Sequence, residues 1–520
     1  MRTAGGLGAA VALATLAAGA ASAPAAGDGA AIASIKAEAR ERSRVMEIAE
    51  TLTDTYGARL TGSPVARAAG EYTRAKLAEF GLVGARLEPW PFGAGWANER
   101  MWLRMVTPEP APLIAYPRAW TPSTAGAVTG AAVLVTGRVA SDLDKYRGTL
   151  KGKIALVDPA PERPDDPRPA RLRDADLAAW SRPPDAGAPR AARVSPEERD
   201  FMNKRDRLFV EEGVLAALEP SRLVGNGTVM VARSGSRLPK DPKVVPTVVL
   251  AIEHYGRIVR LLKRQVPVRL EIDVLNRTFA ETDQSFNVVA EIPGTDKKDE
   301  VVMLGGHLDA WHSGTGATDN AAGCAVMMEA VRILKATGVP LRRTVRIALW
   351  MGEEQSLLGS KAYVKQHLAD RATMSLRPEH ARLSTYLNLD AGTGAIRGIF
   401  LQGNEGARPV FEEWLGPVSD LGAATISIRN SMPGGSDHQS FDEVGLPGFQ
   451  FLQDPSDYED RTHTHHTNMD VYEALDAEAL RKNAAIVAAV VYQAANHPTL
   501  MPRKPLPSPQ APAAPAGAQD

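Results

Sequence analysis

Four side chains that could bind a metal ion or move a proton lie close together in the glycine-rich stretch GGHLDAWHSGTGATDNAAG, residues 305–323. They are His307, Asp309, His312 and Asp319, and the stretch follows directly after the apolar run EVVML. A turn could use the glycines, and an exposed surface could use the polar groups. Their combination directly after a buried strand indicates a functional site.

Further groups of this kind follow other apolar runs. Glu353 and Glu354 follow RIALWM, Asp390 follows STYLNL, and the segment after FQFLQD contains THTHHTN. Each has an ordinary explanation when taken alone, because a glutamate pair is usually solvated and a single aspartate is often a cap. Ligands of open α/β sheets bind beyond the carboxyl ends of the strands, however, so the joint placement favours a site. Imidazoles and carboxylates without thiolates suit a catalytic Zn²⁺.

The elements that must position these groups alternate between strand and helix patterns from about residue 285 onward. FNVVAEI, EVVML and RRTVRIALWM are predicted strands, and NAAGCAVMMEAVRILKATG is a predicted helix. This alternation predicts a largely parallel α/β sheet covered by helices on both faces. Amphipathic helical segments near the N-terminus have no partner among the short β pieces that follow them. We therefore expect them to pack on the later sheet.

The middle of the chain differs in pattern from both flanks. Short β-rich pieces such as AAVLVTG, GKIALVDP and VPTVVLAI are separated by turns and by a charged, proline-rich insert. We predict a discontinuous domain formed by residues 32–105 and 281–497, with residues 106–280 inserted as a second domain. The Pro- and Ala-rich residues 498–520 are predicted to form a disordered tail.

The N-terminal sequence predicts export. One arginine, an apolar Ala/Leu/Val run and the sequence ASA before Pro24 are typical of a secretory signal peptide, assigned to residues 1–23. We therefore expect a secreted or periplasmic protein. The single cysteine, Cys324, permits no intrachain disulfide. A formal net charge of −1 gives no reason to expect a nucleic acid partner, and no later apolar run is long enough for a membrane span.

The successive motifs resemble those of the co-catalytic dizinc exopeptidase family, which includes bacterial leucine aminopeptidases and plasma glutamate carboxypeptidase. In order they are GGHLDAW with GATDNAAG, MGEEQSLLGSKAYV, YLNLD, GGSDHQSF and HTNMD, and ARLTGSP resembles the family's entry motif. YRGTLKGKIALVDP in the middle region resembles part of a protease-associated domain. The resemblance implies an α/β fold with a mixed, mostly parallel sheet sandwiched by helices (zinc aminopeptidase-like) and an inserted β-rich protease-associated domain.

The resemblance also implies two Zn²⁺ ions per chain. His307 and Asp390 would hold one ion, Glu354 and His466 would hold the other, and Asp319 would bridge both. This arrangement agrees with elementary electrostatics, because two neighbouring cations need a shared anionic ligand. A water molecule between two such ions is acidified to hydroxide.

The resemblance gives roles to two further residues beside these ligands. Glu353 would be the general base, which takes a proton from the water and passes it to the leaving amine. Asp309 would accept the remaining N–H of the His307 imidazole and so fix its tautomer. The family resemblance further implies a cis peptide bond after Asp319.

Histidine assignments in the late motifs are less determined by spacing. The segment THTHHTN offers three histidines, and only His466 satisfies the family's His-Thr-x-x-Asp pattern. Either His438 or His465 could donate a hydrogen bond to a developing oxyanion. The spacing leaves that choice open.

The expected activity is hydrolysis of terminal peptide bonds in peptides or dipeptides, most simply as an aminopeptidase. A carboxypeptidase or dipeptidase of the same family is the alternative, because Arg429 could bind a carboxylate while Asp454 and Glu459 could bind an ammonium group. A catalytically inactive binding protein on this fold is disfavoured, since all five ligands and Glu353 are kept. A glutaminyl cyclase, which shares the sheet, is disfavoured by the protease-associated insertion. Peptide substrate is the expected partner, and the oligomeric state stays open, a homodimer included.

Overall fold

The computed structural model describes residues 26–157, 172–181, 195–222, 225–238, 240–279, 284–429, 435–456, 458 and 463–510. The predicted signal peptide, residues 1–23, lies outside these residues. Among the helices of the described part, none combines the length and the apolar character that a membrane crossing requires.

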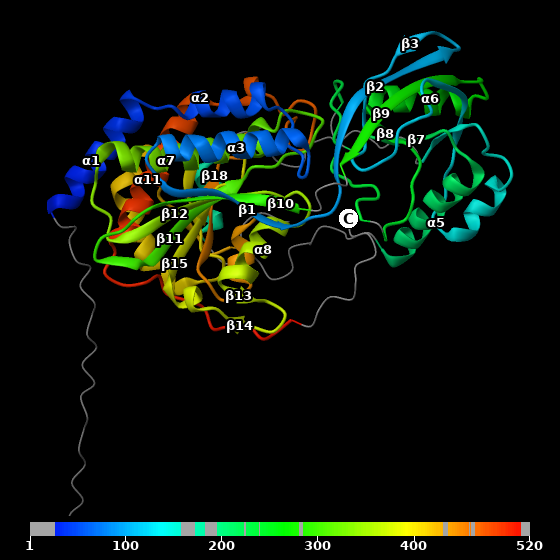
Figure 1. Ribbon diagram of the computed structural model, residues 1–520. Helices are drawn as coiled ribbons and strands as arrows, with labels where there is room; N and C mark the ends of the chain where they lie inside the picture. Colours follow the sequence, from blue (N-terminus) through cyan, green and yellow to red (C-terminus); the bar gives the residue numbers. More distant parts are fainter. Residues whose placement is uncertain are drawn as a thin grey trace, which may run out of the picture.

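The first of two large sheets carries the motifs identified in the sequence (Figure 1). It has eight strands. In spatial order they are β1 (Val83–Pro91), β10 (Gln284–Ile292), β12 (Arg343–Trp350), β11 (Lys297–His307), β15 (Leu383–Asn388), β18 (Gly448–Gln453), β16 (Ile396–Phe400) and β17 (Thr425–Ser427).

Parallel pairing dominates the centre of this sheet. Strand β11 runs parallel to both β12 and β15, and β15 runs parallel to β18. The outer pairs β1–β10, β10–β12 and β16–β18 are antiparallel. The predicted mixed, mostly parallel α/β sheet is therefore confirmed.

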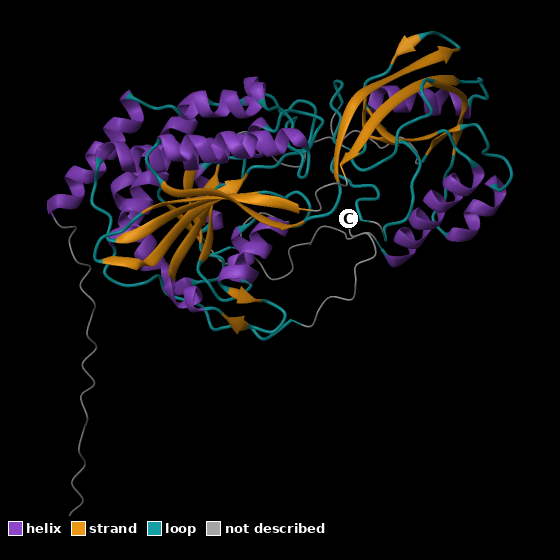
Figure 2. Ribbon diagram, in the orientation of Figure 1, coloured by secondary structure: helices purple, strands orange, loops and turns teal. Residues whose placement is uncertain are grey.

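Both faces of the sheet are buried, which explains the near-continuous apolar runs of the central strands. Along β11, Val302 and Leu304 enter one hydrophobic core, while Val301 and Met303 enter another on the opposite face. Successive side chains of a strand point to opposite faces, so one apolar run supplies both cores. Helices cover each face, as Figure 2 shows.

The helices on the first face come from both ends of the described chain. They are α1 (Ala26–Glu41), α2 (Val45–Glu50), α3 (Pro64–Glu79), α7 (Ala322–Thr337), α9 (Arg408–Leu415) and α11 (Ala477–Asn496). Helix α1 packs on α11 and α7, and α3 packs on β1 and β10. The N-terminal helices thus bury their apolar faces against the later sheet, as expected. The opposite face is covered by α8 (Leu358–His367) and α10 (His438–Asp442).

The second large sheet belongs to the middle of the chain and lies beside the first (Figure 1). In spatial order its strands are β3 (Ala111–Pro112), β2 (Gly95–Thr107), β9 (Arg269–Phe279), β5 (Val128–Leu134), β6 (Ile154–Leu156), β7 (Ala216–Pro220), β8 (Thr247–Leu250) and β4 (Ala115–Pro117). Helices α5 (Pro196–Glu212) and α6 (Ile252–Lys263) belong to the same region, and α4 (Asp174–Trp180) contacts β17 of the first sheet.

Part of the segment expected in the first domain, which we placed up to residue 105, pairs with the second sheet. Strand β2 begins at Gly95 and pairs along its length with β9, so residues 95–107 belong to the second sheet. The antiparallel pairing of β2 with β9 places these residues in the second sheet, and the two strands lie more than 160 residues apart in the sequence. The local sequence GWANERMWLRMVT does not predict which distant strand it pairs with.

The segment 498–510 also differs from the predicted disordered tail. It forms no helix or strand, but Met501 is 2% exposed and Arg503 donates to the carbonyl oxygens of His380 and Leu383. A proline-rich chain can pack in an extended form without its own hydrogen-bond ladder. The remaining tail residues, 511–520, lie outside the described residues.

Candidate metal centre

The carboxyl ends of neighbouring parallel strands bring the sequence-predicted residues together. Strand β11 ends at His307, which pairs in register with Trp350 at the end of β12. On the other side, Gly305 pairs with Asn388 of β15, so the same register places Asp390 beside His307. His307 Nε2 lies 3.1 Å from Asp390 Oδ1. Glu353 lies in the turn that follows β12.

The Asp319 carboxylate lies between two histidines. Its Oδ1 is 3.1 Å from Nε2 of His307, and its Oδ2 is 3.1 Å from Nε2 of His466. Asp319 is 3% exposed and precedes α7, and the Asp319–Asn320 peptide bond is cis, as the resemblance implies. One carboxylate therefore joins two groups of potential ligands.

The second group is completed by Glu354. Its Oε2 lies 2.9 Å from His466 Nε2, and its side chain is 3% exposed. In the described part of the chain, Glu354 Oε1 is a buried atom without a hydrogen-bond partner, and Asp319 Oδ2 accepts no well-aligned hydrogen bond although His466 Nε2 lies 3.1 Å away. Buried carboxylate oxygens need a donor or a cation, so these two atoms fit a metal ion.

The histidines also show that the site attracts positive charge. Burial lowers the pKa of His307, but the carboxylates of Asp390 and Glu353 outweigh burial and raise it well above the ordinary range. The pKa of His466 is raised in the same way, against burial, by Glu354 and Asp319. Protons on both rings would balance the carboxylates, and metal ions bound to the neutral rings would balance them too.

The pair Glu353 and Glu354 follows a turn at Gly352, whose φ of +79° favours glycine. Burial, followed by repulsion from Asp319, raises the pKa of Glu354 to about 7. Burial likewise raises the pKa of Glu353 well above the ordinary range, although His307 opposes it. The turn allows both consecutive carboxylates to reach one site.

The contact between His307 and Asp309 differs in detail from the expectation. His307 Nδ1 lies 2.9 Å from the main-chain carbonyl oxygen of Asp309, and 3.7 Å from its carboxylate Oδ1. The backbone of Asp309 therefore accepts from Nδ1–H and fixes the tautomer that leaves Nε2 for a metal. The carboxylate has other donors, because Thr61 donates to Oδ2 at 2.7 Å and the Glu353 N–H donates to Oδ1 at 3.3 Å.

Thr61, from the entry motif ARLTGSP, connects three parts of the site. Its hydroxyl donates to Asp309 and accepts from the Gly352 N–H at 2.9 Å, and the residue is fully buried. The neighbouring Arg59 is also fully buried and donates to the carbonyl oxygens of Leu308 and Gly316 at 2.8 Å. The N-terminal loop thus supports the loops on either side of the candidate ligands.

Asp470 and Tyr458 support the central carboxylates. Asp470 accepts from the N–H of Thr318 at 2.6 Å and from the N–H of Asp319 at 3.2 Å, which fixes the backbone that carries Asp319. The single proton of the Tyr458 hydroxyl is shared between Asp319 Oδ1 at 3.1 Å and Asp390 Oδ1 at 3.3 Å. The sequence contained both residues without a signal for these roles, although Asp470 ends the HTNMD motif.

The two remaining histidines of the prediction lie in different places. His465 Nε2 is 3.9 Å from Asp319 Oδ2, and its ring centroid is 3.8 Å from that of His466. Its geometry therefore makes it a second candidate ligand next to His466. His438 is fully buried at the start of α10, where burial lowers its pKa to about 3.

The residues considered for binding substrate termini have structural partners. Asp454 lies 3.2 Å from the Arg397 guanidinium and accepts from the Leu172 N–H at 3.1 Å. Arg429 lies over the ring of Trp180, with its guanidinium carbon 5.9 Å from the ring centroid. Glu459 lies outside the described residues. Both described side chains therefore hold the α4 segment against the first sheet.

Known proteins resemble this chain in sequence and in fold. Residues 287–491 match the model of Peptidase family M28. Human Carboxypeptidase Q is 30% identical over 293 residues, which cover 56% of this chain and 58% of that protein. Aminopeptidase YwaD of Bacillus subtilis is 31% identical over 206 residues, covering 39% of this chain and 43% of that protein. The chain thus spans about half the length of the curated relatives it matches.

Solved structures extend the likeness over most of the chain. A Peptidase M28 precursor from Shewanella amazonensis superimposes with a TM-score of 0.68 at 25% identity, covering 92% of this chain and 99% of that one. A zinc aminopeptidase from Bacillus subtilis shares the fold with a TM-score of 0.57 at 18% identity, covering 87% and 94%. Residues 287–491, which include the strand ends that carry the candidate ligands, thus resemble peptidase family M28 in sequence, and the fold is shared over most of the chain.

Proposed function

We propose that the protein is a zinc-dependent exopeptidase that holds two Zn²⁺ ions. The observation that carries this proposal is the Asp319 carboxylate, with one oxygen 3.1 Å from His307 and the other 3.1 Å from His466. His307 and Asp390 would hold one ion, and Glu354 and His466 would hold the other. When bound, the ions would acidify water and polarise the peptide carbonyl group.

The protein's own residues supply the proton transfers and the positioning. Glu353 has a raised pKa, so its carboxylate is a better base than an exposed glutamate. It would accept a proton from the attacking water and give it to the leaving amine. Asp309 accepts from the Glu353 N–H and is itself held by the Thr61 hydroxyl. These two hydrogen bonds would keep the Glu353 carboxylate at the site.

An aminopeptidase is the form of the activity that we favour. Aminopeptidase YwaD of Bacillus subtilis is among the relatives, at 31% identity over 206 residues. Arg59 is saturated by main-chain carbonyl oxygens, and Arg429 stacks on Trp180. A carboxypeptidase or dipeptidase remains the second candidate, because a protein named Carboxypeptidase Q is among the relatives.

An assay with three substrate classes tests the proposal. Purified protein, with and without a chelator, is offered aminoacyl-anilides, free dipeptides and N-blocked peptides. Chelator-sensitive hydrolysis of the anilides supports an aminopeptidase, and hydrolysis of N-blocked peptides alone supports a carboxypeptidase. Glu353→Gln is the control for contaminating peptidases. No hydrolysis of any class by zinc-loaded protein would contradict the proposal.

The remaining proposals concern organisation and location. We propose that the second sheet forms a protease-associated domain inserted into the peptidase domain, because its strands β2 to β9 lie between β1 and β10 in the sequence. The N-terminal sequence supports export to the periplasm or the exterior. Analytical ultracentrifugation would decide between a monomer and the homodimer left open by the sequence.

A further inference from the structure

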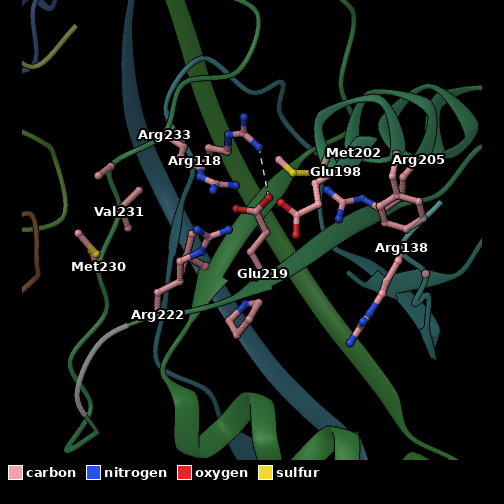
Figure 3. A pocket seen from close by; sticks show the side chains of 15 residues that line it. Arg118, Arg138, Glu198, Met202, Arg205, Glu219, Arg222, Met230, Val231 and Arg233 are labelled. Carbon is pink, nitrogen blue, oxygen red and sulfur yellow. Dashed lines mark hydrogen bonds and ion pairs between the residues drawn. The ribbon is translucent and has the colours of Figure 1, made fainter. Parts of the chain in front are cut away.

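A cavity of about 390 Å³ lies in the region of the second sheet and is lined by an unusual number of arginines (Figure 3). Five arginines and two glutamates line it, which leaves an excess of three positive charges. The arginines are Arg118, Arg138, Arg205, Arg222 and Arg233. The volume is within the range of small-ligand sites.

Glu219 projects from β7 into the middle of this group. Its carboxylate lies 3.2 Å from the Arg118 guanidinium, and Figure 3 shows Arg222 and Arg233 on its other sides. Burial raises the pKa of Glu219, but Arg118 and Arg233 outweigh burial and lower it. One carboxylate therefore balances only one of the surrounding guanidinium groups.

Arg205 pairs with Asp206 at 3.0 Å, but Arg222 and Arg233 differ from it. Over the residues that the structure describes, no carboxylate lies within 4.0 Å of the guanidinium group of Arg222 or Arg233. Burial, and then the charge of Arg222, lower the pKa of Arg233, which shows that the cations repel one another. Folding brings them together although this costs free energy, and a bound anion would relieve that cost.

The wall of the cavity is continuous with the loop that carries His466. Val231 donates its N–H to the His466 carbonyl oxygen at 2.9 Å, and Met230 forms a β-bridge with Thr467. The same short segment continues to Arg233, two residues further. The cavity is therefore a neighbour of the candidate metal centre but shares none of its proposed ligands.

We propose that this arginine pocket binds a compact anion with at least two negative charges, supplied either by acidic side chains of a peptide or by a free oxyanion. Planar guanidinium groups suit this role because each can donate two parallel hydrogen bonds to a carboxylate, phosphate or sulfate group. The partly exposed Arg222 provides the entrance, and the more buried Arg233 and Arg118 provide the interior. The inference does not depend on the proposed peptidase activity.

Calorimetric titration of the full zinc-loaded chain tests the pocket with defined probes. The probes are sulfate, the blocked peptide acetyl-Glu-Glu-Glu-amide, and acetyl-Gln-Gln-Gln-amide as a neutral control. Both peptides are blocked at both ends, so an exopeptidase has no terminus to attack. We expect saturable binding of sulfate or of the Glu peptide that weakens with added salt, and none of the Gln peptide.

Variants connect the binding to the pocket. Arg222→Met and Arg233→Met should each weaken binding by roughly tenfold or more, since each removes charge-assisted hydrogen bonds. Arg264→Met removes an exposed arginine of the same region that does not line the pocket, and it should change nothing. Thermal melting and zinc content verify that each variant is folded, and the exposed position of Arg222 makes its variant the safer of the two.

The outcomes separate the two sources of the anion. Mutual competition between sulfate and the Glu peptide supports a general oxyanion site, and binding of the Glu peptide alone supports a site for acidic peptides. Absence of saturable binding for both probes would overturn the proposal. Binding that persists unchanged in both arginine variants would do the same, because it would place the anion elsewhere, for example at zinc.

Discussion

Replacing Thr61 by valine keeps the shape of a fully buried side chain and removes its hydroxyl. The wild-type hydroxyl donates to Asp309 Oδ2 at 2.7 Å and accepts from the Gly352 N–H at 2.9 Å. Loss of a hydrogen bond to a carboxylate costs about 1.5–3 kcal/mol, and leaving a buried N–H without an acceptor costs about 1–3 kcal/mol. We therefore expect Thr61→Val to lower the free energy of unfolding by about 2.5–6 kcal/mol.

The same change should lower kcat, because Thr61 holds Asp309 and the turn before Glu353 in place. Zinc content should stay at the wild-type level, since Thr61 contacts none of the proposed ligands. Equilibrium urea denaturation, steady-state kinetics and metal analysis of the same preparations measure the three quantities. Thr61→Ser keeps the hydroxyl and should retain most of the stability and the activity.

A matched control is available in α3. Thr73 is also fully buried, but its hydroxyl donates only to the Ala69 carbonyl oxygen of its own helix, at 2.8 Å. Thr73→Val should therefore cost less than about 1 kcal/mol and leave kcat unchanged. Equal losses in Thr61→Val and Thr73→Val would refute the reasoning, because the bridge between Asp309 and Gly352 would then have no special value.

Three further changes test individual roles at the site. Glu353→Gln should reduce kcat by roughly 10²–10⁴-fold and keep zinc bound, because the amide cannot accept the proton. Glu354→Gln should loosen one zinc ion and regain part of its activity with added zinc; loss of zinc from Glu353→Gln instead would show that the two roles are reversed. Tyr458→Phe removes the hydroxyl donor that Asp319 and Asp390 share and should weaken zinc affinity by roughly 10–100-fold, measured by competition with a chromogenic chelator. An unchanged zinc affinity would show that the Tyr458 hydroxyl does not support the metal ligands.

The sequence was sufficient to predict the residues at the ends of the central strands. His307, Asp390 and Glu354 each follow an apolar strand pattern, and parallel pairing places such ends at one edge of a sheet. The register of β11 with β12 and β15 then brings them together. The family motifs added His466, which no periodicity distinguishes from the neighbouring His465.

The local sequence pattern could not predict the hydrogen bonds that support the candidate ligands. Thr61 meets Asp309 across 248 residues, Tyr458 meets Asp319 across 139, and the Asp470 carboxylate meets Thr318 across 152. Such contacts depend on how loops fold back on the sheet, and their residue types are common in turns. The main-chain acceptor for His307 illustrates the same limit, because spacing indicated Asp309 without showing which of its oxygens accepts.

The arginine pocket is a stronger example of the same effect. Arg118, Glu219 and Arg233 lie in different segments of the middle region, each in an unremarkable local sequence. Pairing of β7 with β8 and of β8 with β4, together with a β-bridge between Ala119 and Ser234, places these segments side by side. The overall net charge of −1 conceals this local excess of positive charge.

The central claim is that Asp319 joins two metal ions in one site. Elemental analysis of zinc-loaded protein, after removal of free metal by gel filtration, tests it directly. We expect two zinc ions per wild-type chain and a loss of zinc in Asp319→Ala, which removes the shared carboxylate. A wild-type content of one ion or none, or full retention of both ions in Asp319→Ala, would contradict the account.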